Sequence, residues 1–115
     1  MDEKRSELVY LEDILDAVRK IMAYLSDTSK SEFYANTEKQ DAVLRRLEII
    51  GEASKKISNA LRLRYADVPW RQMAGMRDVV IHEYYGVSLD LIWNVAKKEI
   101  PPLQAKIEQI IEDLQ

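Results

Sequence analysis

The stretch QDAVLRRLEIIGEASKKI, residues 40–57, has the apolar periodicity of one long helix with a buried face. Apolar residues recur there and just beyond it every three or four positions, at Val43, Leu44, Leu47, Ile50, Ala53 (or the neighbouring Ser54), Ile57 and Leu61. This spacing is typical of an amphipathic α-helix. Thr37 and Gln40 have the spacing of a capping box, so the sequence predicts a helix from Thr37 to about residue 62.

Gly51 lies in the interior of this predicted helix. A glycine there is about 1 kcal/mol less favourable than an alanine. We therefore expect a second helix to approach the backbone closely at Gly51.

The same periodicity extends outward in both directions. It predicts a helix over 6–26, a short helical turn over 32–34, and a helix over 68–86 that follows an Asp67 cap. Two further helical patterns flank Pro101 and Pro102, which must kink or restart the chain. No segment has the alternation of a strand. The expected fold is an all-α bundle of four to five helices, formed by residues 1–115 as a single domain.

Composition narrows the classes of function. The chain has 115 residues, 47% hydrophobic and 32% charged, which is typical of one globular domain. It has no cysteine and one histidine, so disulfides, thiolate sites and a zinc site are excluded, and no cofactor is expected. The first residues do not form a secretory signal and no apolar run could span a bilayer, so we expect a soluble, cytoplasmic protein.

Charge is distributed unevenly along the chain. The net charge is −3, yet residues 45–77 contain eight basic and three acidic residues. Such a basic stretch suits a surface that faces phosphate, and solvated helix faces would explain it equally well. On charge alone, the candidate RNA contacts are Lys55, Lys56, Arg62 and Arg64.

The segment MRDVVIHEYYG, residues 76–86, places Arg77 in the middle of an apolar helix face. On a helical wheel, that face consists of Trp70, Met73, Ala74, Met76, Val80, Ile81 and Tyr84. A buried guanidinium is unfavourable unless it is paired. Either this face meets solvent and a partner, or an acid such as Glu52 reaches Arg77, and a purely structural ion pair is as good an explanation as a functional one.

His82 is the only histidine, and it lies five residues after Arg77, about 140° round a regular helix. Asp78 lies four residues before His82 on the same side, where its carboxylate can accept a hydrogen bond from the imidazole and favour the charged ring. A lone helical histidine is more often a surface residue than a catalyst. An arginine, a histidine and an aspartate could nevertheless stabilise a phosphorane and move protons during metal-free RNA cleavage.

Four segments in order carry a resemblance to a known family: YLEDILDAVRKI, QDAVLRRLEIIGEASKKI, VPWRQMAGMRDVVIHEYYGV and IWNVAKKEIPPL. Together with the pattern Arg77-x4-His82-x-Tyr84, the chain resembles the HEPN superfamily, and more closely its HepT-like toxins. The resemblance implies a HEPN-type bundle that dimerises through the helices carrying the motif. It also implies a metal-independent endoribonuclease that leaves 2′,3′-cyclic phosphate ends.

The resemblance also implies a role for each motif residue. His82 would be the general acid and base, Arg77 would hold the scissile phosphate, and Asp78, where many members have asparagine, would support the pair. The expected partners are RNA and an MntA-like nucleotidyltransferase antitoxin, in a type VII-like toxin–antitoxin module. The antitoxin would transfer AMP to Tyr84 rather than Tyr85, which adds charge and bulk beside the cleft. Packing of both tyrosines in the core is the alternative.

Two other functions remain open. The chain could be a non-catalytic helical subunit that binds a minimal nucleotidyltransferase and presents substrate to it. It could also be a degenerate scaffold in which the motif survives as an interface ion-pair network. The complete set of Arg77, Asp78 and His82 favours the enzyme, because a pure adaptor has no chemical need for it.

Overall fold

The computed structural model describes the backbone of residues 3–78 and 89–115, and the side chains of residues 7–78 and 89–115. Every regular element in this part of the chain is helical, which confirms the all-α class. The helices of this part of the chain are more numerous than the four to five expected. In order they are α1 (Glu3–Leu25), α2 (Lys30–Tyr34), α3 (Thr37–Lys55), α4 (Asn59–Arg64), α5 (Trp70–Ala74), α7 (Leu89–Asn94), the π-helical η1 (Val95–Glu99) and α8 (Pro101–Leu114).

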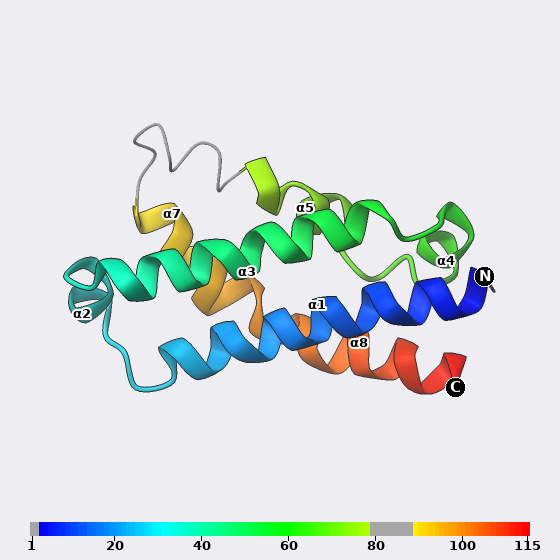
Figure 1. The fold of residues 1–115 in the computed structure, drawn as a ribbon, viewed down its shortest axis with the longest axis horizontal. Coiled ribbons are helices and arrows are strands. Elements are labelled where there is room, and N and C mark those ends of the chain that lie inside the picture. Colours follow the sequence, from blue (N-terminus) through cyan, green and yellow to red (C-terminus); the bar gives the residue numbers. More distant parts are fainter. Residues whose placement is uncertain (1–2, 79–88) are drawn as a thin grey trace.

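The two longest helices, α1 and α3, lie side by side along the long axis of the molecule (Figure 1). α8 packs against α1 and completes the main core. The side chains between them are aliphatic and almost completely buried, as the periodicity predicted. They include Leu11, Ile14, Ile21, Leu47, Ile50, Ile107 and Ile110.

The start of α3 differs from the predicted capping box. Asn36 is the N-cap, and its Oδ1 accepts a hydrogen bond from the backbone N–H of Lys39 at 3.0 Å. Gln40 instead donates from Nε2 to the carbonyl of Phe33 at 2.9 Å. The helix begins at Thr37 as predicted, but its cap is Asn36 and not Thr37, because asparagine is a stronger N-cap than threonine.

The short helical turn expected at 32–34 is present as α2, and it begins with a true capping box. Ser29 accepts a hydrogen bond from the N–H of Glu32, and the Glu32 carboxylate accepts one from the N–H of Ser29. These hydrogen bonds from Ser29 hold the pKa of Glu32 below its ordinary value.

The helix predicted to reach residue 62 ends at Lys55, and α4 begins after a break. Ser58 caps α4 by accepting from the N–H of Leu61 at 3.2 Å. The buried carboxylate of Glu7 in turn accepts from the backbone N–H and the hydroxyl of Ser58, at 3.1 and 3.2 Å. Local periodicity missed the break because Glu7, which stabilises it, lies 51 positions away.

The predicted start of the next helix at 68 was also wrong. α5 begins at Trp70 after Pro69, without a side-chain cap from Asp67. It ends at Ala74, and the chain is helical again over 76–78. At the interruption the N–H of Asp78 donates to the carbonyl of Gly75 at 2.9 Å. This hydrogen bond spans three residues where an α-helical one spans four, so the turn is tighter than in an α-helix.

A new helix, α8, begins at the two prolines, which is one of the two expected outcomes, a kink or a restart. Pro101 and Pro102 occupy the first two positions of α8, where a missing N–H leaves no intrahelical bond unmade. Before them the N–H of Ile100 reaches back to Val95 at 3.0 Å and closes a π turn. In the described ranges, no helix combines the length and the apolar character needed to cross a membrane.

Candidate functional site

Arg77 meets Glu52 at the start of the motif segment. Its Nε lies 2.8 Å from Oε1 of Glu52, and the two side chains are 47% and 42% exposed. Of the two alternatives, Glu52 does reach Arg77, and the guanidinium is also half exposed to solvent and not buried in an apolar face. Exposed ion pairs contribute about 0–1 kcal/mol to folding, so this pair orients the arginine more than it stabilises the fold.

Gly51 brings the backbone of α3 against the same arginine. A Cβ at position 51 would lie 2.8 Å from the backbone nitrogen of Arg77 and 3.0 Å from its Cβ. It would also lie 3.3 Å from the carbonyl oxygen of Ala74. The predicted close approach is confirmed. Gly51 and Glu52 together determine where the Arg77 backbone lies and where its side chain points.

Asp78 follows Arg77 on the surface, and its side chain makes no ion pair or hydrogen bond with any described residue. His82, Tyr84 and Tyr85 fall within residues 79–88, outside the described part of the chain. Their roles, and the contact between Asp78 and His82, stay predictions.

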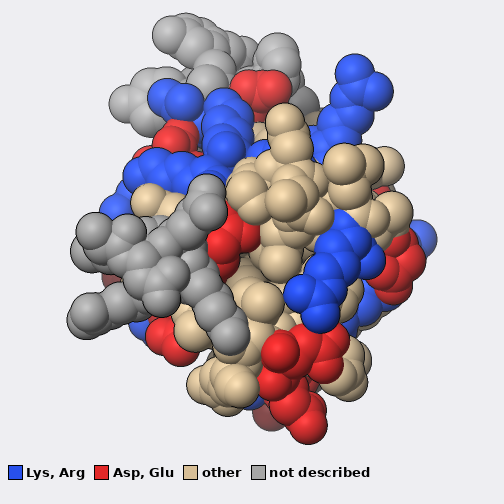
Figure 2. Space-filling model, turned by 90° about the vertical axis from the view of Figure 1, so that its right-hand side faces the viewer, with Lys and Arg blue, Asp and Glu red and all other residues tan. Residues whose placement is uncertain are grey.

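The four basic candidates for RNA contact have different surroundings. Arg62 is half-buried, and its Nη2 donates to the carbonyl of Ser54 at 2.6 Å, which satisfies the end of α3. Lys55, Lys56 and Arg64 are exposed. At the end of the molecule that carries α4, Lys and Arg occupy much of the upper part with some Asp and Glu among them, and Asp and Glu gather at the lower edge (Figure 2). Lys55, Lys56 and Arg64 therefore stay candidate RNA contacts, because their side chains are accessible.

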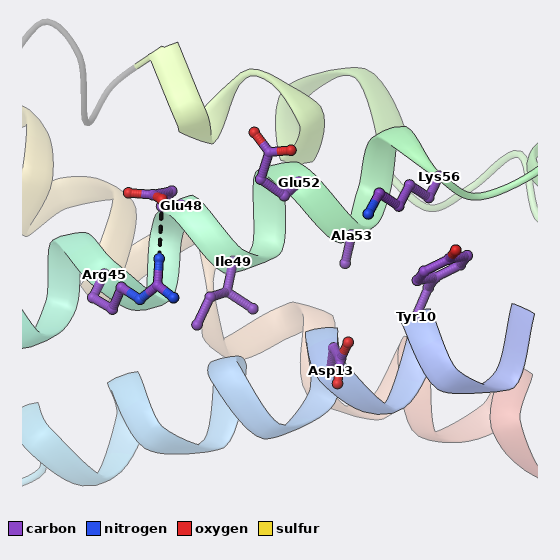
Figure 3. A pocket seen from close by; sticks show the side chains of 8 residues that line it. All are labelled: Tyr10, Asp13, Arg45, Glu48, Ile49, Glu52, Ala53 and Lys56. Carbon is purple, nitrogen blue, oxygen red and sulfur yellow. Dashed lines mark hydrogen bonds and ion pairs between the residues drawn. The ribbon is translucent and has the colours of Figure 1, made fainter. Parts of the chain in front are cut away.

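A pocket of about 190 Å³ opens between α1 and α3 beside the Arg77–Glu52 pair (Figure 3). Glu52 forms part of its wall and turns toward α5, away from α1. Its other lining residues are Tyr10, Asp13, Arg45, Glu48, Ile49, Ala53 and Lys56.

The sequence reasoning missed most of this pocket. Tyr10 and Asp13 lie three positions apart on α1, while Arg45 and Ile49 lie four apart on α3. That spacing was available as a signal, but which edges of the two helices face each other is a property of the packing. Among the side chains of residues 7–78 and 89–115, no group of three His, Asp or Glu residues could hold a metal ion.

Comparison with known proteins points to one family. The family model "Ribonuclease HepT-like" matches residues 14–110. The chain is 43% identical over 107 residues to "Probable ribonuclease HepT" of Thermococcus cleftensis, covering 93% of this chain and 97% of that protein. It is 42% identical over 112 residues to a "Putative RNase" of Methanocaldococcus jannaschii, covering 97% of each.

A third relative is longer. "Gamma-glutamylcyclotransferase and putative RNase" of M. jannaschii is 43% identical over 106 residues, and the match spans 92% of this chain but 48% of that protein. No solved structure matches the chain significantly. The family match covers most of the chain, and two of these relatives match over nearly their whole length. The chain therefore belongs to the HepT-like ribonuclease family.

Proposed function

We propose that this protein is a metal-independent endoribonuclease that cleaves RNA through Arg77 and His82. The observation that supports this most directly is the state of Arg77, which is half exposed and paired through Nε to Glu52. A structural arginine in an exposed pair adds little stability. An arginine held in one orientation at the surface is suited to bind an anion.

Arg77 would bind phosphate through the two Nη groups of its guanidinium. Glu52 engages the Nε side of the guanidinium, and the Nη groups have no partner among the described residues. Two parallel N–H groups match two phosphate oxygens, and such bidentate contacts are stronger and more directional than neutral hydrogen bonds. In this role Glu52 is a positioning residue, because it aims the guanidinium at the phosphate without touching the phosphate itself.

The proposed reaction needs one proton acceptor and one proton donor. The 2′-hydroxyl loses its proton to a base and attacks the adjacent phosphorus, while the bond from phosphorus to the 5′-oxygen breaks and an acid protonates that oxygen. The products are a 2′,3′-cyclic phosphate and a 5′-hydroxyl. Arg77 would stabilise the added charge on the phosphorane oxygens, and His82 would transfer the protons.

Each chain supplies one histidine for these two proton transfers. A homodimer that joins two motif segments would provide a His82 on each side of the phosphate. We therefore propose a dimer built through this part of the molecule. A sedimentation mass equal to one chain at micromolar concentration would contradict it.

We further propose that the protein acts in the cytoplasm as the toxin of a two-gene module. A nucleotidyltransferase antitoxin would transfer AMP to Tyr84, and the added negative charge would repel RNA from the cleft. The resemblance of the motif supports this control. Co-expression with the partner should increase the intact mass by one AMP in the wild type and in Tyr85→Phe, but not in Tyr84→Phe.

The decisive experiment is cleavage of total cellular RNA in EDTA by wild-type protein beside His82→Ala, with end-group analysis. Cleavage by the wild type only, with cyclic phosphate ends, is the expected result. Intact RNA with Tyr84 shown by mass to be unmodified would favour the rival function, a non-catalytic subunit that presents substrate to a nucleotidyltransferase.

A further inference from the structure

The pocket between α1 and α3 has the size and lining of a site for one flat ring. Its volume of about 190 Å³ is below the range of about 300–1,000 Å³ for drug-sized ligands. Tyr10 and Asp13 project from α1, and the remaining side chains come from α3 and its C-cap, Lys56 (Figure 3).

One end of the pocket offers a stacking surface. Tyr10 is half-buried, and Lys56 holds its Nζ 5.6 Å from the centre of the tyrosine ring. Ile49 and Ala53 supply an apolar wall beside it. Unpaired RNA bases stack on such aromatic surfaces. A base entering here would displace the Lys56 ammonium from the ring face toward a flanking phosphate.

Asp13 places an exposed carboxylate in the wall of the pocket. Its carboxylate lines the pocket and has no hydrogen bond or ion pair with any described residue. An ionised carboxylate only accepts hydrogen bonds, and it can accept two that are parallel. Guanine is the RNA base whose Watson–Crick edge presents two neighbouring N–H donors. Adenine and cytosine present one donor beside an acceptor, and uracil presents one donor between two acceptors.

Arg45 adds a donor at the opposite end. It pairs with Glu48 at 3.0 Å, and 61% of its side chain is exposed, so it keeps N–H groups for a ligand. Arginine is the usual partner of the guanine O6 and N7 acceptors. The lining contains three carboxylates and two cations, a balance that suits a neutral base better than a phosphate.

Glu52 connects this pocket to the proposed reaction, because it lines the pocket and contacts Arg77 at 2.8 Å. We propose that the pocket binds one unpaired nucleobase, guanine in preference to the others, beside the phosphate that Arg77 holds. This inference rests on the proposed function for its biological meaning. Base binding itself can be measured independently of cleavage.

The first test is titration of the 115-residue protein with GMP, AMP, CMP and UMP, with binding measured by calorimetry. We expect GMP to bind about tenfold more tightly than the other three, as one good bidentate contact allows. Asp13→Asn should remove this preference, because an amide presents a donor where the carboxylate presents an acceptor. Tyr10→Ala should weaken binding of all four nucleotides.

The matched control is Glu12→Gln, which neutralises the neighbouring exposed acid of α1 outside the pocket. It should keep the GMP preference. Equal affinity for the four nucleotides, or an unchanged GMP preference in Asp13→Asn, would overturn the inference.

The second test uses single-stranded RNAs with randomised positions around the cleavage point, sequenced after digestion. The wild type should show guanine at one fixed position, and Asp13→Asn should cleave with that preference lost. Cleavage without any base preference would overturn the pocket and leave the ribonuclease intact. Uncleaved RNA together with an Asp13-dependent GMP preference would reject the proposed reaction and support the pocket.

Discussion

The two sides of α3 differ in what they contribute. On its buried side Leu47 and Ile50 lie completely in the aliphatic core. Toward α5 it presents Gly51 and Glu52, which hold a half-exposed arginine. One helix thus carries much of the stability on one face and the proposed chemistry on the other. Substitutions on the two faces should therefore have separable effects.

The largest effect is expected on the core face. Leu47→Ala removes a completely buried side chain, and such substitutions lower the free energy of unfolding by about 2–5 kcal/mol. Denaturant unfolding should show this loss, while cleavage per folded molecule stays near the wild-type rate. A large loss of cleavage by fully folded protein would contradict the separation. Leu63→Ala is the control, because Leu63 is 79% exposed.

Arg77→Ala should have the converse effect. Loss of a group that stabilises charge in the transition state lowers kcat by about 10²–10³-fold. Unfolding should change by less than about 1 kcal/mol, because the pair with Glu52 is exposed. Arg77→Lys should restore little activity, since an ammonium lacks the bidentate edge. The exposed Arg71 of α5 serves as control, and an equal loss in Arg71→Ala would indicate a general charge effect instead.

Gly51→Ala tests the boundary between the two faces of α3, where a change should affect both stability and cleavage. Its Cβ would lie 2.8 Å from the backbone nitrogen of Arg77, so one helix must shift, and overpacking of this kind is unfavourable by about 1–3 kcal/mol. Thermal unfolding and cleavage should both decrease.

Gly75→Ala is the matched control for that substitution. A Cβ there meets nothing closer than 3.4 Å, and the backbone φ of −71° suits any residue. Its stability should stay unchanged or increase by up to about 1 kcal/mol. Destabilisation by both alanines would show that the close approach at Gly51 is not the cause.

Glu52→Gln should have a smaller effect, because it removes the charge that orients Arg77 while keeping the shape of the side chain. We expect kcat to decrease by about tenfold, as for loss of one charge-assisted contact, with little change in melting temperature. In Arg77→Ala the same substitution should change nothing further, since a positioning residue acts only through the group it positions. Additive losses would mean that Glu52 acts independently.

The smallest expected effect concerns pH and a surface contact far from the motif. The Tyr65 hydroxyl donates to Asp113 at 2.7 Å. This bond, with a second from Gln109, holds the pKa of Asp113 below its ordinary value. The same contact with Asp113 raises the pKa of Tyr65.

The stabilisation from Asp113 is therefore present above the ordinary carboxyl pKa and is lost as pH falls through the lowered one. The stabilisation from Tyr65 is present below its ordinary pKa and is lost as pH rises through the raised one. In Tyr65→Phe the melting temperature should therefore depend less on pH than in the wild type, at both the acidic and the alkaline extreme. Tyr24→Phe is the control, because Tyr24 lies on α1 and takes no part in this contact, and it should keep the wild-type profile.

The sequence alone predicted the all-α class, the buried faces of α1, α3 and α8 and the close approach at Gly51, and it offered a pair of Glu52 with Arg77 as one of two alternatives. Helical periodicity is a property of the local sequence, and the unfavourable free energy of an unpaired buried charge depends on the residue type. Both can therefore be read from the sequence. The resemblance of the motif segments likewise predicted the family, which the comparisons confirm.

Only the tertiary structure decided where the helices break and which side chains meet between them. α3 ends at Lys55 because the carboxylate of Glu7 accepts a hydrogen bond from Ser58 across the fold. The guanidinium of Arg62 donates to the carbonyl of Ser54 near the same break. The pocket exists because Tyr10 and Asp13 of α1 face α3. Each of these contacts joins positions distant in sequence or on separate elements, so its energy depends on how the helices pack and not on the pattern within any one of them.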